Sequence, residues 1–416
     1  MTLERVVITG LGAVSALGCG ADTNFEQALE GHSGIDFLTL PSERQRPATV
    51  AAQIRFPLPD LIKRAELPLF DRFAQLGWTA AHEALQQSGL STGTDTGLLE
   101  NSGVFWGTGM GGAGTLEAGY VDLFVEGKDR VRPMSIVASM NNAAAAQIAM
   151  RCGFGGTVNN YSSACVSSAQ AIGEAYRHIR HGYAERVLAG GSEALLTYGV
   201  VSAWDALRVL APADAEHPER SCRPFSGNRS GLVLGEGGAA VMLESLSSAK
   251  SRGATILAEL VGYGTSNDAV HITKPDPAGQ GRAMRMALAD AKLSATGIDY
   301  INAHGAGTPA GDLAETESIK QVFGDSAHKL MVSSTKSMHG HTLGAAGALE
   351  FVMTVQTLRN KAVPPTAFLD HADPACDLDY VPLHARRNQE IRAAMSNSFA
   401  FGGSNVALIV QGFTED

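Results

Sequence analysis

The sequence predicts an α/β protein in which helices cover the faces of the β-sheets. Short apolar runs that are typical of buried strands alternate with helical patterns along the whole chain. The chain has 47 glycines among 416 residues and only 18% charged residues, which is typical of a well-buried protein with tight turns. The alternation starts again near residue 253, so we expect two similar halves, residues 1–252 and 253–416.

The first half is predicted to contain five strands and two helices. The strands are predicted from apolar and β-branched runs at 6–9, 104–106, 158–161, 186–190 and 239–243. A helix is predicted over 71–88, because its apolar residues recur on one face. A second helix is predicted after residue 161 from a stripe at helical spacing, formed by Ala169, Ile172, Tyr176 and Ile179.

The second half repeats the pattern. Strands are predicted at 256–261, 300–303, 331–333 and 405–411, and helices at 283–293, 310–323 and 344–358. We find no short-period repeat and no low-complexity linker.

Composition excludes several classes of protein. The net charge of −10 argues against a general nucleic-acid-binding protein, because such proteins neutralise phosphates with basic residues. The five cysteines form no C-x-x-C pair, so the sequence favours neither a metal site nor a disulfide framework. No run of 18 apolar residues occurs, and we expect no membrane-spanning helix and a cytoplasmic location.

Gly10 and Gly12 follow the first predicted strand and resemble part of a dinucleotide-binding fingerprint. Ser15 stands where the third glycine would be, and no acidic residue lies about 20 positions on. We therefore expect a tight turn from strand to helix here rather than a nicotinamide site.

Cys165 lies between a predicted strand and a predicted helix, among the small residues Ser163, Ala164 and Ser167. A helix N-terminus favours the thiolate and should lower the pKa of the thiol from about 8.5. Cys165 is therefore a candidate nucleophile, although a buried structural cysteine is equally compatible with the pattern. We expect the other four cysteines to be structural.

Two histidines lie in turns of small residues. His304 ends a predicted buried strand, where functional residues gather in α/β proteins, and His341 follows Gly340. Each could equally be a capping or core histidine. His271 and His339 are expected to be structural. The segment 397–405, with Phe399 and Phe401 beside two glycines, could present backbone N–H groups to a ligand or form a hairpin turn beside the core.

Taken in order, these segments resemble the β-ketoacyl-[acyl carrier protein] synthase family, the condensing enzymes of fatty-acid and polyketide synthesis, and especially its type II elongating members. The matching motifs are V-V-I-T-G-L-G at 6–12, S-A-C at 163–165, V-L-A-G-G-S-E at 187–193, R-P-F at 223–225, G-x-V-L-G-E-G at 231–237, N-A-H-G at 302–305, T-P-A-G-D at 308–312, V-S-S-T-K-S at 332–337, G-H at 340–341 and N-S-F-x-F-G-G-S-N at 397–405.

The resemblance implies a thiolase-like fold with two pseudo-duplicated halves in five α/β layers. It also implies a homodimer with the active site between the halves of each chain. The implied catalytic residues are Cys165, His304 and His341, with Lys336 and Glu350 orienting the histidines.

By the same resemblance, Cys165 takes an acyl chain from the phosphopantetheine arm of an acyl carrier protein. His304 and His341 then stabilise the enolate left by decarboxylation of malonyl-carrier protein. The backbone N–H groups of Cys165 and Phe401 form the oxyanion hole, and the Phe401 side chain separates the site from the acyl pocket. No metal or redox cofactor is implied.

Some positions depart from the family pattern. Ala306 and Gly307 replace the usual Thr and Ser, which removes hydroxyls expected near the pantetheine. Ser226, Asn228 and Ser230 replace the usual acidic residues, and His339 replaces a common Thr. These changes suggest a specialised branch. The expected substrate-binding residues are Met110, Met134, Ile136, Thr308 and Phe399.

An acidic carrier protein needs a local basic patch on this acidic chain. Lys63, Arg64 and Arg72 match the docking region of the family, and Arg208, Arg130 and Arg132 are further candidates, although any of them could be ordinary surface charge.

The function predicted from the sequence is a β-ketoacyl-[acyl carrier protein] synthase of fatty acid biosynthesis. A ketosynthase of a dedicated polyketide or polyene pathway is a close alternative. A chain-length partner subunit of a heterodimer usually lacks the nucleophile. A thiolase would need a second cysteine in segment 397–405, and a dehydrogenase is the least favoured alternative.

Overall fold

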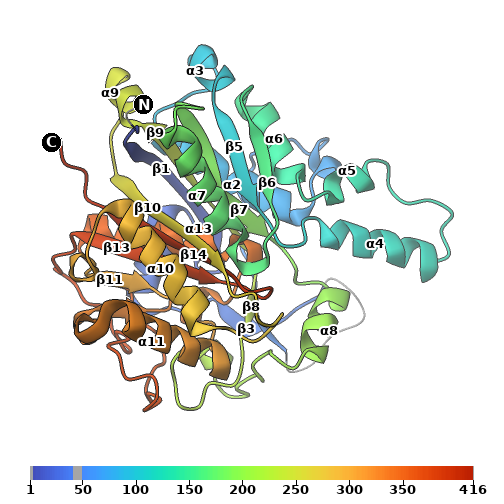
Figure 1. The fold of residues 1–416 in the computed structure, drawn as a ribbon. Coiled ribbons are helices and arrows are strands. Elements are labelled where there is room, and N and C mark those ends of the chain that lie inside the picture. Colours follow the sequence, from blue (N-terminus) through green and yellow to red (C-terminus); the bar gives the residue numbers. More distant parts are fainter. Residues whose placement is uncertain (1–2, 41–48, 416) are drawn as a thin grey trace.

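The computed structural model describes residues 3–40 and 49–415. Within these residues, eleven strands form one continuous sheet in the order β12-β11-β13-β14-β10-β1-β9-β7-β5-β6, with β2 paired to β1 (Figure 1). A separate three-stranded sheet has the order β3-β4-β8.

The strands of the large sheet are β1 (Val6–Ser15), β2 (Gly18–Cys19), β5 (Gly103–Gly107), β6 (Val158–Tyr161), β7 (Arg186–Glu193), β9 (Gly237–Ser245), β10 (Ala258–Asn267), β11 (Tyr300–Asn302), β12 (Met331–Ser333), β13 (Ala393–Phe399) and β14 (Ser404–Gln411). Those of the small sheet are β3 (Ile35–Phe37), β4 (Val50–Ala52) and β8 (Leu234–Gly235).

The helices are α1 (Ala21–Leu29), α2 (Arg72–Gln87), α3 (Thr96–Glu100), α4 (Ala113–Phe124), α5 (Ser135–Ser139), α6 (Ala143–Cys152), α7 (Ser167–Arg180), α8 (Tyr198–Ala206), α9 (Leu246–Ser251), α10 (Pro277–Ala291), α11 (Pro309–Phe323), α12 (Lys336–His339) and α13 (Ala346–Asn360). Short 3₁₀ turns include η2 (Ala164–Val166), η5 (Gly324–Lys329) and η6 (Leu343–Ala345).

The large sheet repeats its topology on either side of its centre. Outward from the central β1–β10 pair, the order is β1-β9-β7-β5-β6 on one side and β10-β14-β13-β11-β12 on the other. In both directions the first two strand pairs outward from the centre are antiparallel, and the three outermost strands run parallel to one another.

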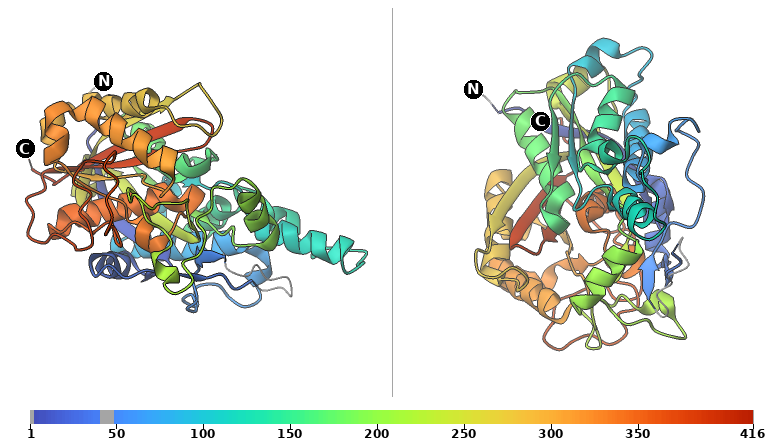
Figure 2. Two further views of the ribbon diagram at one scale, coloured as in Figure 1. Left: turned by 90° about the horizontal axis from the view of Figure 1, so that it is seen from below. Right: turned by 90° about the vertical axis from the view of Figure 1, so that its right-hand side faces the viewer.

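Helices cover both faces of each side of this sheet. Helix α2 packs on β1 and β9, and α10 packs on β10 and β14. Between the two sides, α7 packs against β5 and β7, α13 packs against β13, and the two helices contact each other (Figures 1 and 2). The result is the five-layer α/β arrangement, and the starts of α7 and α13 meet at its centre.

Strand β1 corrects one expectation from the sequence. It does not turn into a helix after Thr9 but continues, fully buried, to Ser15. A Cβ on Gly10 or Gly12 would lie 2.0 Å from the carbonyl oxygen of Ala84 or Ala80. The glycines therefore let α2 pack directly on the strand, which no side chain would permit.

Several elements differ from the sequence prediction. Helix α10 begins at Pro277, six residues before the predicted start, because Asp276 caps its first N–H groups. Strand β13, whose small and polar residues are all buried, was not predicted, and neither were α4, α5, α6 and α8. Segment 397–405 spans the end of β13, a turn and the start of β14, which is the hairpin alternative. No helix in the described part of the chain is both long and apolar enough to cross a bilayer.

Candidate active site

Cys165 lies at the elbow between β6 and α7. The 3₁₀ turn η2 carries it, and α7 begins two residues later. Ala164 has a φ of +51°, a backbone conformation that few residues other than glycine adopt without strain. The Cys165 side chain is 7% exposed and lines a cavity of about 440 Å³. The predicted position at the start of a helix is therefore confirmed.

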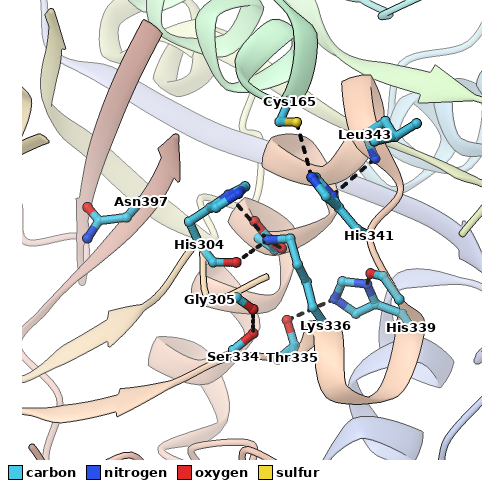
Figure 3. A network of polar contacts seen from close by, with 12 residues as sticks. Cys165, His304, Gly305, Ser334, Thr335, Lys336, His339, His341, Leu343 and Asn397 are labelled. Atoms are coloured by element: carbon cyan, nitrogen blue, oxygen red, sulfur yellow. Dashed lines mark hydrogen bonds and ion pairs between the residues drawn. The ribbon is translucent and has the colours of Figure 1, made fainter. Parts of the chain in front are cut away.

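The two predicted histidines converge on this sulfur from the second half of the chain (Figure 3). His304 follows β11, and His341 follows α12 and Gly340, whose φ is +64°. Nε2 of His341 lies 3.1 Å from Sγ of Cys165. The imidazole rings are 5.2 Å apart and nearly perpendicular. Both rings line the cavity.

The hydrogen bonds define the tautomers of both rings. Nδ1 of His341 accepts a hydrogen bond from the backbone N–H of Leu343 at 3.3 Å. Nδ1 of His304 faces the ammonium of Lys336 at 3.5 Å, and an ammonium can only donate. Each neutral ring therefore carries its proton on Nε2, and His341 donates that proton toward the cysteine sulfur.

Lys336 and Glu350 form an ion pair whose side chains are both inaccessible to solvent. Nζ of Lys336 also donates to the backbone oxygen of His304 at 2.5 Å. The pair thus holds the main chain and the ring of His304, and Figure 3 shows Lys336 beside that histidine.

Burial determines the protonation states in the site. Removal from water and the nearby Lys336 charge hold the pKa values of His304 and His341 well below the ordinary value of 6.5. Burial also raises the pKa of the Cys165 thiol to about 12, although Lys336 and the backbone N–H of Phe401 act in the opposite direction. The lowered pKa expected from the helix N-terminus is therefore wrong for the free protein, because desolvation outweighs it.

Two buried carboxylates that sequence reasoning did not single out hold the loops of the site. Glu315 accepts hydrogen bonds from the backbone N–H groups of His304 and Gly305, at 2.9 and 2.8 Å. Glu193 accepts from Gly109 in the first half and Gly344 in the second, at 2.5 and 3.0 Å. Burial raises the pKa of each to about 7. For Glu193, the available signal was an acidic residue ending a buried strand.

The β13–β14 hairpin brings Phe399 and Phe401 to the cavity, which Thr308 also lines. The backbone N–H of Phe401 faces the Cys165 sulfur and acts to lower the pKa of the thiol. Its ring stacks on Trp204 of α8, with centroids 6.0 Å apart. The turn therefore contributes a main-chain donor to the sulfur and an aromatic wall to the cavity.

Three predicted substrate-binding residues are not among the lining residues of this cavity. Met110, Met134 and Ile136 are 50%, 49% and 65% exposed. They belong to the segment of residues 110–140, whose helix α4 projects from the body of the protein (Figure 1).

The predicted docking residues are dispersed. Lys63 and Arg64 are exposed. Arg72 is ion-paired with the buried carboxylate of Glu236 at 3.2 Å, so part of its charge is already neutralised. Arg208 is exposed and lines the catalytic cavity. No cluster of three or more His, Cys, Asp or Glu side chains suited to a metal ion occurs in the described residues.

Comparison with protein families gives two adjoining matches. The beta-ketoacyl synthase N-terminal domain matches residues 3–249, and the C-terminal domain matches residues 257–370. The chain belongs to the β-ketoacyl synthase family. It is a condensing enzyme of the synthase II type, and therefore a transferase.

Individual relatives agree with this assignment. The chain is 45% identical over 406 residues to nodulation protein E of Rhizobium meliloti (strain 1021), covering 97% of this chain and 98% of that protein. It is 40% identical over 413 residues to 3-oxoacyl-[acyl-carrier-protein] synthase 2 of Staphylococcus aureus (strain COL), covering 99% of both.

Solved structures confirm the predicted thiolase-like fold. A beta-ketoacyl synthase from Burkholderia phymatum STM815 matches with a TM-score of 0.89 and 36% identity, over 99% of this chain and 100% of that one. A type II polyketide ketosynthase, solved in complex with its acyl-carrier protein, matches with a TM-score of 0.90 and 32% identity, over 99% of this chain and 100% of that chain.

Proposed function

We propose that this synthase elongates an acyl chain bound to Cys165 by decarboxylative condensation with malonyl-carrier protein. The observation that carries the proposal is the contact of 3.1 Å between Nε2 of His341 and Sγ of Cys165, beside a second neutral imidazole in one cavity. A nucleophile and two N–H donors are the groups that this reaction requires.

In the first step, Cys165 attacks the acyl thioester of the carrier arm. The thiol gives up its proton as it attacks, and that proton ends on the departing pantetheine sulfur. Nε2–H of His341 and the backbone N–H of Phe401 stabilise negative charge on the attacking sulfur. The backbone N–H groups of Cys165 and Phe401 then stabilise the oxyanion of the tetrahedral intermediate.

In the second step, malonyl-carrier protein loses carbon dioxide. Nε2–H of His304 and of His341 donate to the thioester oxygen of the resulting enolate. Its carbon attacks the acyl group on Cys165, and the cysteine thiolate leaves and takes a proton from water. Lys336 and Glu350 act as positioning residues for His304, and neither the cysteine step nor the enolate step requires a bound cofactor.

Binding of the carrier protein and of a second copy belongs to the same proposal. Lys63, Arg64 and Arg208 would meet an acidic carrier protein, and Arg208 would do so at the cavity. A homodimer would cover the exposed apolar segment of residues 110–140 and bring Met110, Met134 and Ile136 to the acyl pocket. The cytoplasmic location and the division at residues 252 and 253 stay predictions.

Mass spectrometry of the intact protein tests the proposal. After incubation with a panel of acyl-carrier proteins, we expect the mass of one acyl group, mapped to Cys165. The Cys165→Ala variant should gain none, whereas Cys152→Ala, which changes another buried cysteine, should load normally. Loading on any other cysteine, or condensation by Cys165→Ala, contradicts the proposal.

Similarity to nodulation protein E favours one alternative, a synthase of a dedicated acyl pathway. The loss of hydroxyls at Ala306 and Gly307 agrees with a specialised branch. The same acyl panel separates the alternatives, because a fatty-acid synthase should accept and elongate ordinary saturated chains. A chain-length partner subunit would show no loading on Cys165.

A further inference from the structure

One polar side chain in the wall of the catalytic cavity lacks a hydrogen-bond partner. Gln280 lies near the start of α10, is 1% exposed and lines the cavity that contains Cys165. Its Oε1 accepts no hydrogen bond from any described residue. Because buried polar atoms in proteins are nearly always satisfied, this oxygen indicates a donor that the free protein does not supply.

The loop of residues 306–308, which forms another part of the wall, offers few side-chain hydrogen-bonding groups. Ala306 lines the cavity without a hydroxyl, and its neighbour Gly307 has no side chain. Thr308 also lines the cavity, but its Oγ1 accepts a hydrogen bond from Gly311 at the start of α11, at 3.3 Å. Gln280 is therefore the buried side-chain amide available to a ligand in this wall.

The substrate of the proposed reaction brings amides into the cavity. A phosphopantetheine arm contains two secondary amides between its phosphate and its sulfur. An amide that leaves water without a new hydrogen bond loses free energy, so a cavity that binds the arm tightly must provide partners.

We propose that Gln280 binds a secondary amide of the phosphopantetheine arm, with Oε1 accepting the hydrogen of the arm N–H. Gln280 thus takes the place of the hydroxyls that positions 306 and 307 lack. The planar carboxamide rotates about its terminal bond, which lets it present oxygen or N–H₂ to the arm. The inference rests on the proposed function, because it assumes that a carrier arm enters this cavity.

The test compares two acyl donors for Cys165. Acyl-pantetheine has both amides, whereas the p-nitrophenyl ester of the same acid has none. In Gln280→Leu, which keeps a similar side-chain size, we expect the KM for acyl-pantetheine to rise about tenfold with kcat unchanged. The rate with the p-nitrophenyl ester should not change. Gln86→Leu, at an exposed site on α2 away from the cavity, is the matched control and should alter neither.

A second measurement tests whether Gln280 acts on the amides of the phosphopantetheine arm. Replacing the arm amides by esters exchanges each N–H for an oxygen that cannot donate. In the wild type this exchange should raise KM about tenfold, and in Gln280→Leu it should have almost no effect. Even where the variant folds poorly, a wild type that is insensitive to the exchange overturns the inference.

The outcomes separate the two proposals. If Gln280→Leu loses the same share of its acylation rate with both acyl donors, the residue has a structural role only and the inference is overturned. So would equal sensitivity of wild type and variant to the amide-to-ester exchange, or no sensitivity in the wild type. Failure of the wild type to acylate Cys165 with either donor contradicts the proposed function itself.

Discussion

The ammonium of Lys336 is paired with the carboxylate of Glu350 at a place where neither side chain reaches solvent. Glu350 belongs to α13 in the central layer, and Lys336 also donates to the backbone oxygen of His304. The ion pair therefore links the packing of the central helices to the position of one catalytic ring.

Replacing one partner of the Lys336–Glu350 ion pair should destabilise the protein more than replacing both. Lys336→Met leaves Glu350 buried without its cation, and we expect a loss of about 3 kcal/mol in the free energy of unfolding. The double variant Lys336→Met/Glu350→Leu should recover most of this stability but little condensing activity, because His304 has lost its support. Urea denaturation and a condensation assay measure the two effects. A double variant as unstable as the single one would contradict the interpretation.

The two catalytic histidines should be separable by partial reactions. His341→Ala should reduce decarboxylation of malonyl-carrier protein by about 10²–10³-fold, the loss typical of a missing donor to developing negative charge. Acylation of Cys165 should be less affected, because the backbone N–H of Phe401 still reaches the sulfur. Release of labelled carbon dioxide and intact-protein mass report the two steps. Equal losses in both steps would count against this division of roles.

His339 should make stability depend on pH. Burial, assisted by the charge of Lys336, lowers its pKa to about 3, and its ring nitrogens contact the Gly340 carbonyl and Thr335 Oγ1 at 2.8 and 2.9 Å. Below pH 6.5 the unfolded chain binds a proton at this histidine that the folded chain does not, so stability falls as the pH falls.

The His339→Asn variant removes this titration and retains an N–H donor for the Gly340 carbonyl. Between pH 6.5 and 5, the free energy of unfolding of the variant should improve relative to wild type by about 1.6 kcal/mol, because the slope rises to roughly 1.4 kcal/mol per pH unit below the pKa of the unfolded histidine. Denaturation curves at both pH values measure the change. A difference between the two proteins that does not vary with pH would disprove the assignment.

Charge reversal should weaken recognition of the carrier protein. In Lys63→Glu/Arg64→Glu we expect a several-fold increase in KM for acyl-carrier protein, which high salt should diminish because the charges are exposed. Acyl-pantetheine, which lacks the protein, should react unchanged. Lys329→Glu, an exposed reversal in η5, is the control. An unaltered KM for the carrier protein would remove these residues from the docking surface.

The sequence predicted the strands and helices with strong periodicity, and it predicted the elbow at Cys165. It could not predict β13, because Ala393–Phe399 consists mostly of small and polar residues whose burial comes from neighbouring layers. The end of β1 was missed for a related reason. Gly10 and Gly12 indicate a turn in isolation, whereas here they accommodate α2.

The site was predictable as a set of residues but not in its electrostatics. A helix N-terminus can be recognised in a sequence, and it indicates a lowered thiol pKa. The depth of burial that raises the pKa of Cys165 depends on the whole fold. Glu193 is recognisable in the sequence as an acidic residue that ends a buried strand, but its backbone partners Gly109 and Gly344 lie far away in the chain, so its role depends on the fold.

The hydrogen bonds of Glu193 restrict how the two repeats can move apart. Its carboxylate spans the seam between the two repeats, since it accepts from Gly109 on one side and from Gly344 on the other. A hinge opening of the repeats would have to break these buried bonds and would draw the imidazole of His341 away from the thiol. Admission of a substrate without separation of the repeats would leave the spacing of the reacting atoms unchanged.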